Sequence, residues 1–225
     1  MFFSRFGLMD GSNMVANCML LFHDYCLVLM ATILTYVIFM FFICYKSRGF
    51  SVTTLQGSNF LEMVWTIIPM FFLLSLGLPS FMMMYYLEGE SKGDLTYKVI
   101  GHQWYWSYEN NDFIDYSFDS YMLPLEEMNV GDNRLLEVDN GLTLPYGSLN
   151  RMVITSTDVL HAWALPSMCL KVDAVPGRLN TLSLFSLSPG TFYGQCSEIC
   201  GINHSFMPIK VEFIGWNDFL KSLFN

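Results

Sequence analysis

The chain has 225 residues, of which 53% are hydrophobic, and its formal net charge is −9 at pH 7. This length suits one folded domain plus a small membrane anchor. The acidic balance disfavours nucleic acid as a partner, because phosphate binding requires an excess of basic side chains.

Two uncharged stretches in the N-terminal part of the chain predict transmembrane helices. Tyr25 to Tyr45 covers 21 residues, and Met63 to Leu87 covers 25. At 1.5 Å per residue they would be roughly 31 Å and roughly 37 Å long, enough to cross a hydrocarbon core. Pro69 and Pro79 lie within the second stretch. Such prolines are tolerated where neighbouring helices satisfy the freed carbonyl groups, which favours a larger assembly.

The loop between the two stretches, residues 46–62, predicts their orientation. It carries Lys46 and Arg48 close to the end of a span, and positively charged loops face the cytoplasmic or matrix side. Residues 1–24, the lead-in to the first span, and residues 88–225 would then lie on the opposite side. Glu62 is a lone carboxylate at the inner edge of the second span. An ionisable residue there is a candidate for function, although a solvated interfacial acid explains its position equally well.

Residues 88–225 predict an all-β domain of the sandwich or barrel type. Short β-type runs alternate with Gly, Pro, Asn and Asp from Glu88 onward. We expect an acidic loop over residues 110–128, a turn over 171–177 and a short C-terminal helix over 216–223, with Asn217 as a possible cap. The predicted strands are 97–108, 135–139, 151–156, 159–164, 178–185, 191–195 and 209–213.

The first of these strands carries a row of aromatic side chains. If residues 97–108 form an unbroken strand, His102, Trp104, Trp106 and Tyr108 share one face. Such a row usually packs in a core, and a tryptophan that faces a partner is the rarer alternative.

Metal-binding side chains are concentrated between the last two predicted strands. Cys196, Cys200, His204 and Met207 fall within twelve residues. Sulfur and imidazole ligands favour copper, zinc or an iron–sulfur cluster over hard cations. Two thiolates can bridge a pair of copper ions with one histidine capping each, and His161 is the candidate for the second cap. The layout is cupredoxin-like, with a ligand loop joining two strands.

Three other interpretations of the two cysteines remain open. They can form a disulfide, which an oxidising compartment permits but which leaves His204 and Met207 without a role. They can hold zinc together with His161 and His204, although zinc has no use for the methionine. They can also be inert buried thiols. We prefer the dicopper site, because it uses all of these side chains.

The net charge of the chain comes entirely from the predicted β-domain. Residues 88–225 hold 17 acidic and 8 basic side chains, a net of −9, whereas residues 1–87 hold 3 of each. A field of this sign favours a basic protein partner, because it steers association. Ordinary solubility is the alternative explanation.

With these residues identified, the chain resembles the subunit II family of mitochondrial haem–copper cytochrome c oxidases. The resemblance covers nearly the full length. Its motifs are Phe22–Asp24, Trp65–Pro69, Gly101–Trp106, Phe118–Met122, Leu135–Asn140, Leu160–Trp163, Pro176–Asn180 and the segment Gly194–Met207.

The resemblance implies that the β-domain binds the dinuclear copper centre called CuA. The two thiolates would bridge the copper ions, and Glu198 would contribute its backbone carbonyl. The implied copper ligands are His161, Cys196, Glu198, Cys200, His204 and Met207.

Further roles are implied by the same resemblance. The side chain of Glu198 would bind Mg²⁺ at the boundary with the catalytic subunit, and Asp173 is a candidate for its outer shell. Trp104 would receive electrons from bound cytochrome c, and Glu62 would lie at the mouth of a proton pathway. A docking surface for cytochrome c would comprise Glu109, Asp112, Asp115, Asp119, Asp139 and Asp158.

The implied protein is a two-pass subunit of the mitochondrial inner membrane, with both termini and the copper domain in the intermembrane space. It would pass electrons from reduced cytochrome c to haem centres on catalytic subunit I, coupled to oxygen reduction and proton pumping. The alternatives are an anchored binding module with structural zinc and an oxidase subunit that has lost its copper. Met83, Gly141 and Ser188 replace basic residues that are usual in the family, but none is a ligand.

Overall fold

The computed structural model describes residues 8–46, 57–88, 93–113 and 115–224. Contacts divide the chain into two compact units, which are Cys18–Gly89 and the combination of Met1–Asn17 with Glu90–Asn225. The first unit contains most of two long helices. The second contains a β-sandwich and the start of the first helix.

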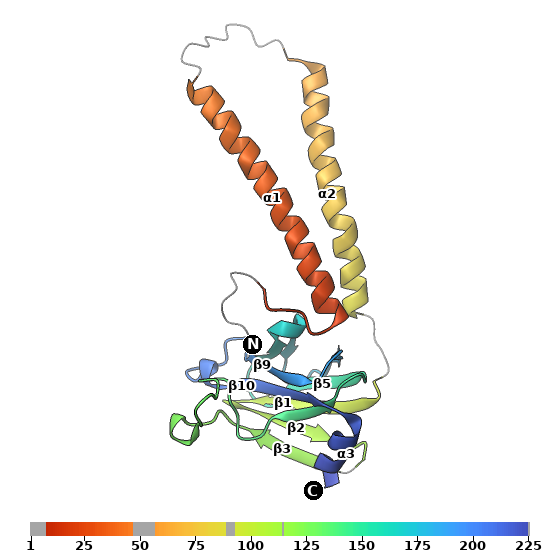
Figure 1. The fold of residues 1–225 in the computed structure, drawn as a ribbon, viewed down its shortest axis with the longest axis vertical. Coiled ribbons are helices and arrows are strands. Elements are labelled where there is room, and N and C mark those ends of the chain that lie inside the picture. The colour runs from red at the N-terminus through yellow and green to blue at the C-terminus, as the bar shows by residue number, and fades with distance from the viewer. Residues whose placement is uncertain (1–7, 47–56, 89–92, 114, 225) are drawn as a thin grey trace. The chain divides into compact units, whose positions relative to one another are not determined.

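The two predicted spans are helical. Helix α1 spans Met14–Lys46, and helix α2 spans Asn59–Glu88 with Pro69 and Pro79 inside it (Figure 1). Both are long and apolar enough to cross a membrane. Helix α1 begins at Met14 rather than at Tyr25, so it includes part of the polar lead-in. Arg48, on which the predicted orientation partly rests, lies outside the described residues.

Several polar side chains in the helical unit form hydrogen bonds within it. The hydroxyl groups of Thr32 and Thr35 donate to backbone carbonyls one turn earlier, at 2.8 and 2.7 Å. The hydroxyl of Tyr25 donates to Ser75 Oγ at 2.9 Å and links α1 to α2. Such bonds remove the cost of placing an unpaired polar group in an apolar surrounding.

The larger sheet of the β-domain has the strand order β3-β2-β1-β5-β8. Strands β1 and β5 run parallel, and every other pair in it is antiparallel. The strands are β1 (Leu95–His102), β2 (Tyr105–Asn110), β3 (Tyr116–Ser120), β5 (Asn150–Ser156) and β8 (Asn180–Leu184).

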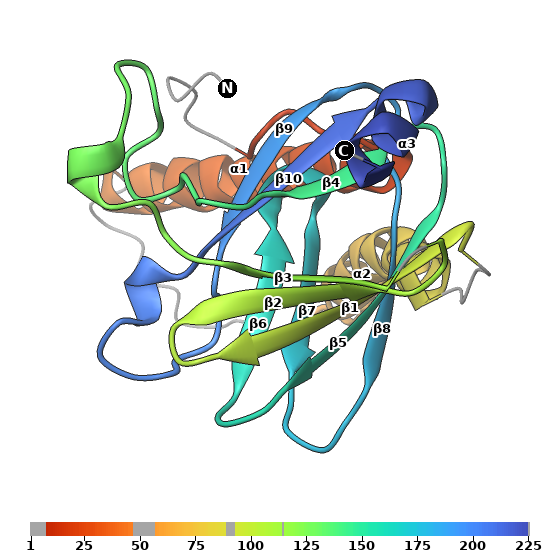
Figure 2. The ribbon, with the colours of Figure 1, turned by 90° about the horizontal axis from the view of Figure 1, so that it is seen from below.

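A second sheet has the order β4-β10-β9. Strands β6 and β7 form a separate pair, in which β6 contacts β9 and β7 contacts β5 and β8. Figure 2 shows the two sheets as layers, with β6 and β7 beside them. The strands are β4 (Leu142–Pro145), β9 (Gly190–Gln195), β10 (Pro208–Ile214), β6 (His161–Leu165) and β7 (Leu170–Ala174).

The core lies between these layers, because alternate residues of each strand point inward. In β2 the buried positions include Trp106 and Tyr108, and in β5 they include Met152 and Ile154. Strand β6 is buried at all five positions, so its first residue, His161, starts in the interior. The expected sandwich is therefore confirmed.

Helix α3 (Trp216–Phe224) confirms the predicted C-terminal helix. It packs against β4 and buries Phe219. Asn217 is not its cap, because the helix begins one residue earlier and the carbonyl of Gly215 accepts from the backbone N–H groups of Asp218 and Phe219.

The expectation of one unbroken strand over residues 97–108 is wrong. The chain turns at Gln103 and Trp104, so β1 and β2 form a hairpin in which His102 pairs with Tyr105. No Gly, Pro, Asn or Asp marks this turn in the sequence. The four aromatic side chains therefore do not share one face: Trp106 and Tyr108 enter the core, whereas Trp104 lies in the turn.

The predicted strand over 135–139 is also wrong. Leu135 has φ +66°, and only Val138 forms a β-bridge, with Met122. Backbone N–H groups of Leu136 and Glu137 donate instead to the carbonyl of Asn133, which makes a turn. Three strands fall where none was expected: β3 within the acidic loop 110–128, β4, and β7 within the predicted turn 171–177.

Candidate metal centre

Two segments bring the candidate ligands to one place. His161 opens β6, and residues 196–207, the ligand loop, connect β9 to β10. Because Gln195 pairs with Pro208 in the β9–β10 ladder, both ends of the ligand loop are fixed by strand hydrogen bonds. The backbone N–H of Ser197 also donates to the carbonyl of Ala162, which ties the ligand loop to β6.

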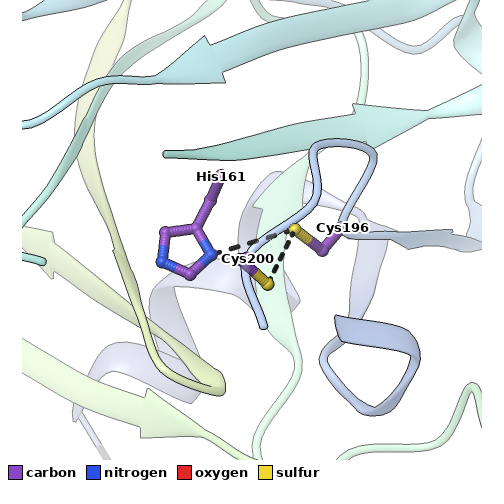
Figure 3. A group of neighbouring side chains, drawn as sticks. All are labelled: His161, Cys196 and Cys200. Atoms are coloured by element: carbon purple, nitrogen blue, oxygen red, sulfur yellow. Dashed lines mark hydrogen bonds between the residues drawn. The ribbon is translucent and has the colours of Figure 1, made fainter. Parts of the chain in front are cut away.

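The two thiols and one imidazole face one another (Figure 3). Cys196 Sγ lies 3.9 Å from Cys200 Sγ and 3.9 Å from His161 Nδ1. The potential ligand atoms of these three buried residues all lie within 4.8 Å of one another. The second histidine, His204, places Nδ1 3.4 Å from Cys200 Sγ.

The remaining expected donors belong to the same cluster. Met207 Sδ lies 3.5 Å from Cys200 Sγ, and the carbonyl oxygen of Glu198 lies 3.4 Å from Cys196 Sγ. The structure therefore brings together all six donors that the resemblance implies.

This donor set fits a pair of copper ions better than the alternatives. Both cysteines are free, and their sulfur atoms are 3.9 Å apart, far beyond the roughly 2.05 Å of a disulfide bond. Two thiols and two imidazoles would complete a tetrahedral zinc site and leave Met207 and the Glu198 carbonyl without a role. Two facing sulfurs with additional donors on either side match a thiolate-bridged pair.

A carboxylate orients the imidazole of His161. Asp158 Oδ1 lies 2.9 Å from His161 Nε2, and because a carboxylate only accepts, Nε2 carries the hydrogen. In its neutral form the ring therefore presents its Nδ1 lone pair to the thiols. Such outer hydrogen bonds fix the tautomer and orientation of a metal-binding histidine.

Burial and hydrogen bonds separate the acidities of the two thiols. Burial raises the pKa of Cys196, but hydrogen bonds with His161 and nearby backbone groups outweigh it and lower the pKa to about 7. Burial, together with charge on Cys196, raises the pKa of Cys200 to about 12. Burial lowers the pKa of His161, but hydrogen bonds with Cys196 and Asp158 reverse the shift and raise it. Because Cys200 loses its proton only with difficulty here, a bound metal ion would be needed to keep both sulfur atoms as thiolates.

Trp104 lies beside the ligand loop. A Cβ built on Gly201 would lie 3.2 Å from Trp104 Cζ2 and 3.3 Å from its Nε1, so this edge of the indole lies close to that glycine, next to Cys200. Gly201 also has φ +125°, which disfavours any other residue. The Nε1 atom of Trp104 is buried and has no hydrogen-bond partner in the described part of the chain, so packing against its neighbours positions the ring.

The side chain expected to bind Mg²⁺ contacts a lysine. Lys171 Nζ lies 3.9 Å from Glu198 Oε2 and 3.8 Å from Asp173 Oδ1. The ammonium group of Lys171 thus contacts both carboxylates, and one of them belongs to Glu198, whose carbonyl oxygen faces Cys196. Glu62 lies in the first turn of α2, in the helical unit.

The expected docking acids all lie in the β-domain, and most make internal hydrogen bonds. Asp112, Asp119 and Asp139 accept from neighbouring groups at 2.6–2.8 Å. Glu109 pairs with Lys98 at 2.8 Å. The full set is Glu109, Asp112, Asp115, Asp119, Asp139 and Asp158.

Sequence reasoning missed two contacts at the centre. Gln103 Nε2 donates to the carbonyl of Cys200 at 2.8 Å, and Trp106 Nε1 donates to the carbonyl of Met207 at 3.4 Å. The partners are 97 and 101 positions apart, so no local pattern reveals them.

Comparison with known proteins agrees with this geometry. The family model described as the periplasmic domain of cytochrome c oxidase subunit II matches residues 95–214, and the model of its transmembrane domain matches residues 3–83. Cytochrome c oxidase subunit 2 of Branchiostoma floridae is 46% identical over 223 residues, which cover 96% of each chain. That of Albinaria caerulea is 47% identical over 218 residues, again 96% of each chain.

A solved structure matches the β-domain. The periplasmic domain of subunit II of cytochrome oxidase from Bradyrhizobium japonicum aligns with a TM-score of 0.55 and 43% identity, covering 59% of this chain and 93% of that one. The sandwich is thus cupredoxin-like, as expected. The two spans and the animal relatives support a two-pass protein of the mitochondrial inner membrane. The chain belongs to the cytochrome c oxidase subunit II family.

Proposed function

We propose that electrons enter the oxidase through this subunit. It accepts them from reduced cytochrome c at a dinuclear copper centre and passes them to haem centres on catalytic subunit I, where oxygen reduction and proton pumping are coupled. The observation that carries the proposal is the facing pair Cys196 and Cys200, with sulfur atoms 3.9 Å apart and imidazole Nδ1 atoms on both sides.

The residues of the cluster suit electron transfer rather than substrate chemistry. A thiolate-bridged copper pair supplies a reversible one-electron couple. His161, Cys196, Cys200 and Met207 are buried, which excludes water from the site. The ligand loop is fixed at both ends by the β9–β10 ladder, so the donors are held rigidly. A rigid, dry site needs little rearrangement when its charge changes.

The surface around the site suits a basic electron donor. Residues 88–225 carry the whole net charge of −9, which would steer a positively charged protein towards this domain. Trp104, in the β1–β2 turn and against Gly201, is the proposed point of electron input. We propose the six acids expected from the sequence as the docking surface.

Three finer assignments belong to the same proposal. Glu198 would bind Mg²⁺ through its side chain, with Asp173 nearby, because both carboxylates already gather around the cation of Lys171. Glu62 would open a proton pathway from the inner side. The β-domain and both termini would face the intermembrane space, in keeping with Lys46 at the last turn of α1.

Replacing Cys196 or Cys200 with serine in the assembled oxidase tests the function. We expect loss of the mixed-valence copper spectrum and of electron transfer from cytochrome c. Cys169→Ser is the matched control, because Cys169 is a free, partly buried cysteine outside the ligand set, and it should change neither. Normal electron input in Cys200→Ser, or zinc in place of copper in the unsubstituted complex, would refute the proposal.

Docking is tested separately through its dependence on salt. Neutralising Asp119 and Asp139 should slow association with cytochrome c, and the loss should shrink at high ionic strength, because exposed charges are screened. Asp218→Asn, an exposed acid on α3, is the control. An unchanged salt dependence in the double variant would remove Asp119 and Asp139 from the docking surface.

A further inference from the structure

The turn between β1 and β2 is hydrogen-bonded to both segments that carry the metal ligands. Gln103 Nε2 donates to the carbonyl oxygen of Cys200 at 2.8 Å. The backbone N–H of Gln103 donates to Asp158 Oδ2 at 2.7 Å, and the other oxygen of that carboxylate holds His161. Gln103 thus contacts the ligand loop through its side chain, and through its backbone it contacts Asp158, the residue that orients His161.

Two glycines allow the hairpin to come this close. A Cβ on Gly101 would lie 2.9 Å from the ring of His161, so the end of β1 lies directly on that imidazole. A Cβ on Gly201 would lie 3.2 Å from both Gln103 Nε2 and the Trp104 ring. The hairpin therefore contacts the candidate centre at two places, His161 and the ligand loop. In the ligand loop, both Trp104 and the amide of Gln103 lie against Gly201.

The amide of Gln103 is well placed to hold the neighbouring indole. Among the residues that the structure describes, Trp104 Nε1 has no hydrogen-bond partner, so the ring is positioned by packing against its neighbours. The end of β1 next to the turn is held by other residues: Ser156 Oγ donates to the Gly101 carbonyl at 3.1 Å, and Thr157 Oγ1 bonds His102 Nδ1 at 2.8 Å. Among the described residues of the turn, Gln103 alone donates a side-chain hydrogen bond to the ligand loop.

We propose that Gln103 is a positioning residue for electron input, which fixes the Trp104 indole against Gly201 beside the ligand Cys200. The inference rests on the proposed function. In the step concerned, one electron leaves reduced cytochrome c and is taken up at the site, and no covalent bond forms or breaks. Gln103 does not itself accept the electron. It sets the distance and the contact across which the electron crosses from the surface to the ligand loop.

The test is Gln103→Leu in the assembled oxidase. This change keeps the backbone N–H that bonds Asp158 and retains a side chain of similar size, but it removes the amide donor. We expect normal copper content and an unchanged copper spectrum. At saturating cytochrome c the rate of electron input should fall by about tenfold, because a displacement of about 1 Å at a reacting contact can cost up to about 100-fold. The KM for cytochrome c should stay the same.

Two further measurements separate positioning from general damage. Gln103→Glu has the same shape but presents no donor to the Cys200 carbonyl, so it should also be slow at saturating cytochrome c. Reduction by hexaammineruthenium(II), a small reductant that does not need the protein docking site, should proceed at the normal rate in Gln103→Leu. Thr157→Val removes a hairpin bond that does not reach the ligand loop, and it should leave electron input unchanged.

A normal rate of electron input in Gln103→Leu would overturn the inference and leave the proposed function intact. So would a loss of copper from that variant, or an equal slowing in Thr157→Val, since both would show a purely structural role. Absence of the copper spectrum from the unsubstituted complex would overturn the inference and the proposed function together.

Discussion

His161 uses its two ring nitrogens for different purposes: Nε2 donates to the carboxylate of Asp158 at 2.9 Å, and Nδ1 faces the thiol of Cys196 at 3.9 Å. The carboxylate is itself held by the backbone N–H of Val159 at 2.6 Å. These hydrogen bonds outweigh the effect of burial and lower the pKa of Asp158, so it stays charged at neutral pH. Asp158 thus supports the centre from within, in addition to its proposed place on the docking surface.

Asp158→Asn should therefore weaken copper binding as well as docking. The amide would hold His161 less firmly and would not enhance its basicity, and such outer partners are typically worth about 10–100-fold in metal affinity. Competition with a copper chelator measures the change. Asp119→Asn is the control, because Asp119 bonds only Ser107 among the described side chains and should alter association alone. Equal copper affinity in the two variants would contradict the inner role of Asp158.

Gly101→Ala should displace His161. The added Cβ would lie 2.9 Å from the ring, closer than real Cβ contacts, and the ring is buried and cannot swing aside. We expect copper loss and a cost of about 1–3 kcal/mol in the free energy of unfolding. Gly215→Ala is the control, since its Cβ would meet nothing closer than 3.8 Å. Full copper occupancy in Gly101→Ala would show that the site tolerates the shift.

Glu137 should make the β-domain sensitive to acid. This residue is 7% exposed and accepts from Tyr193 OH and Lys210 Nζ, each at 2.6 Å, which fastens the loop before β4 to strands β9 and β10. Burial alone would raise its pKa, but bonds from Lys210 and Tyr193 lower it below the ordinary 4.5. The unfolded chain therefore binds the proton more readily, and the stability that Glu137 contributes is present above pH 4.5 and is lost as the pH falls through its folded pKa.

Denaturant unfolding of the full chain in detergent at pH 7 and at pH 4 or below measures this effect through tryptophan fluorescence. Glu137→Gln should lower stability at pH 7 by about 1–3 kcal/mol and flatten the pH dependence. The contrary result is an acid sensitivity that is the same in the variant and in the parent chain.

Asn13 lies outside residues 88–225, but we expect it to stabilise the β-domain. Its side chain caps α1 by accepting from the Ala16 N–H at 2.7 Å, and Ser12 bonds the backbone of Ser167 and Leu187. Asn13→Ala should cost about 1–2 kcal/mol in the free energy of unfolding, as for other buried caps. The exposed Asn217 on α3 gives the control Asn217→Ala, which should cost nothing measurable. Equal stability of the two variants would exclude a capping role.

The parts of the fold that follow from local pattern were predictable from the sequence. The uncharged lengths of α1 and α2, the alternation in β10 and the spacing in α3 all mark their elements directly. The hairpin at Gln103 and Trp104 was missed, because its turn lacks the usual residues and its conformation depends on bonds to Asp158 and Cys200. Strand β3 was missed because its polar residues pair with β2 while facing solvent.

The candidate centre was predictable to a similar extent and for similar reasons. Five of its six donors share the ligand loop, and the spacing of the four donor side chains among them already indicates a metal site. His161 lies far before the ligand loop in the sequence, so it could be named only as a candidate for the second histidine ligand, and the resemblance then implied that role. The supporting bonds of Asp158, Gln103 and Trp106 join segments that are distant in sequence, and only the folded chain reveals them.

The most direct test of the account is the copper content of the assembled oxidase compared with that of its Cys196→Ser variant. The comparison cancels any copper held by partner subunits. If Cys196 and Cys200 bridge a metal pair, the variant should contain two fewer copper ions per chain and should lack the mixed-valence signal in electron paramagnetic resonance. Equal copper content in the two complexes, with zinc bound at this site, would contradict the account.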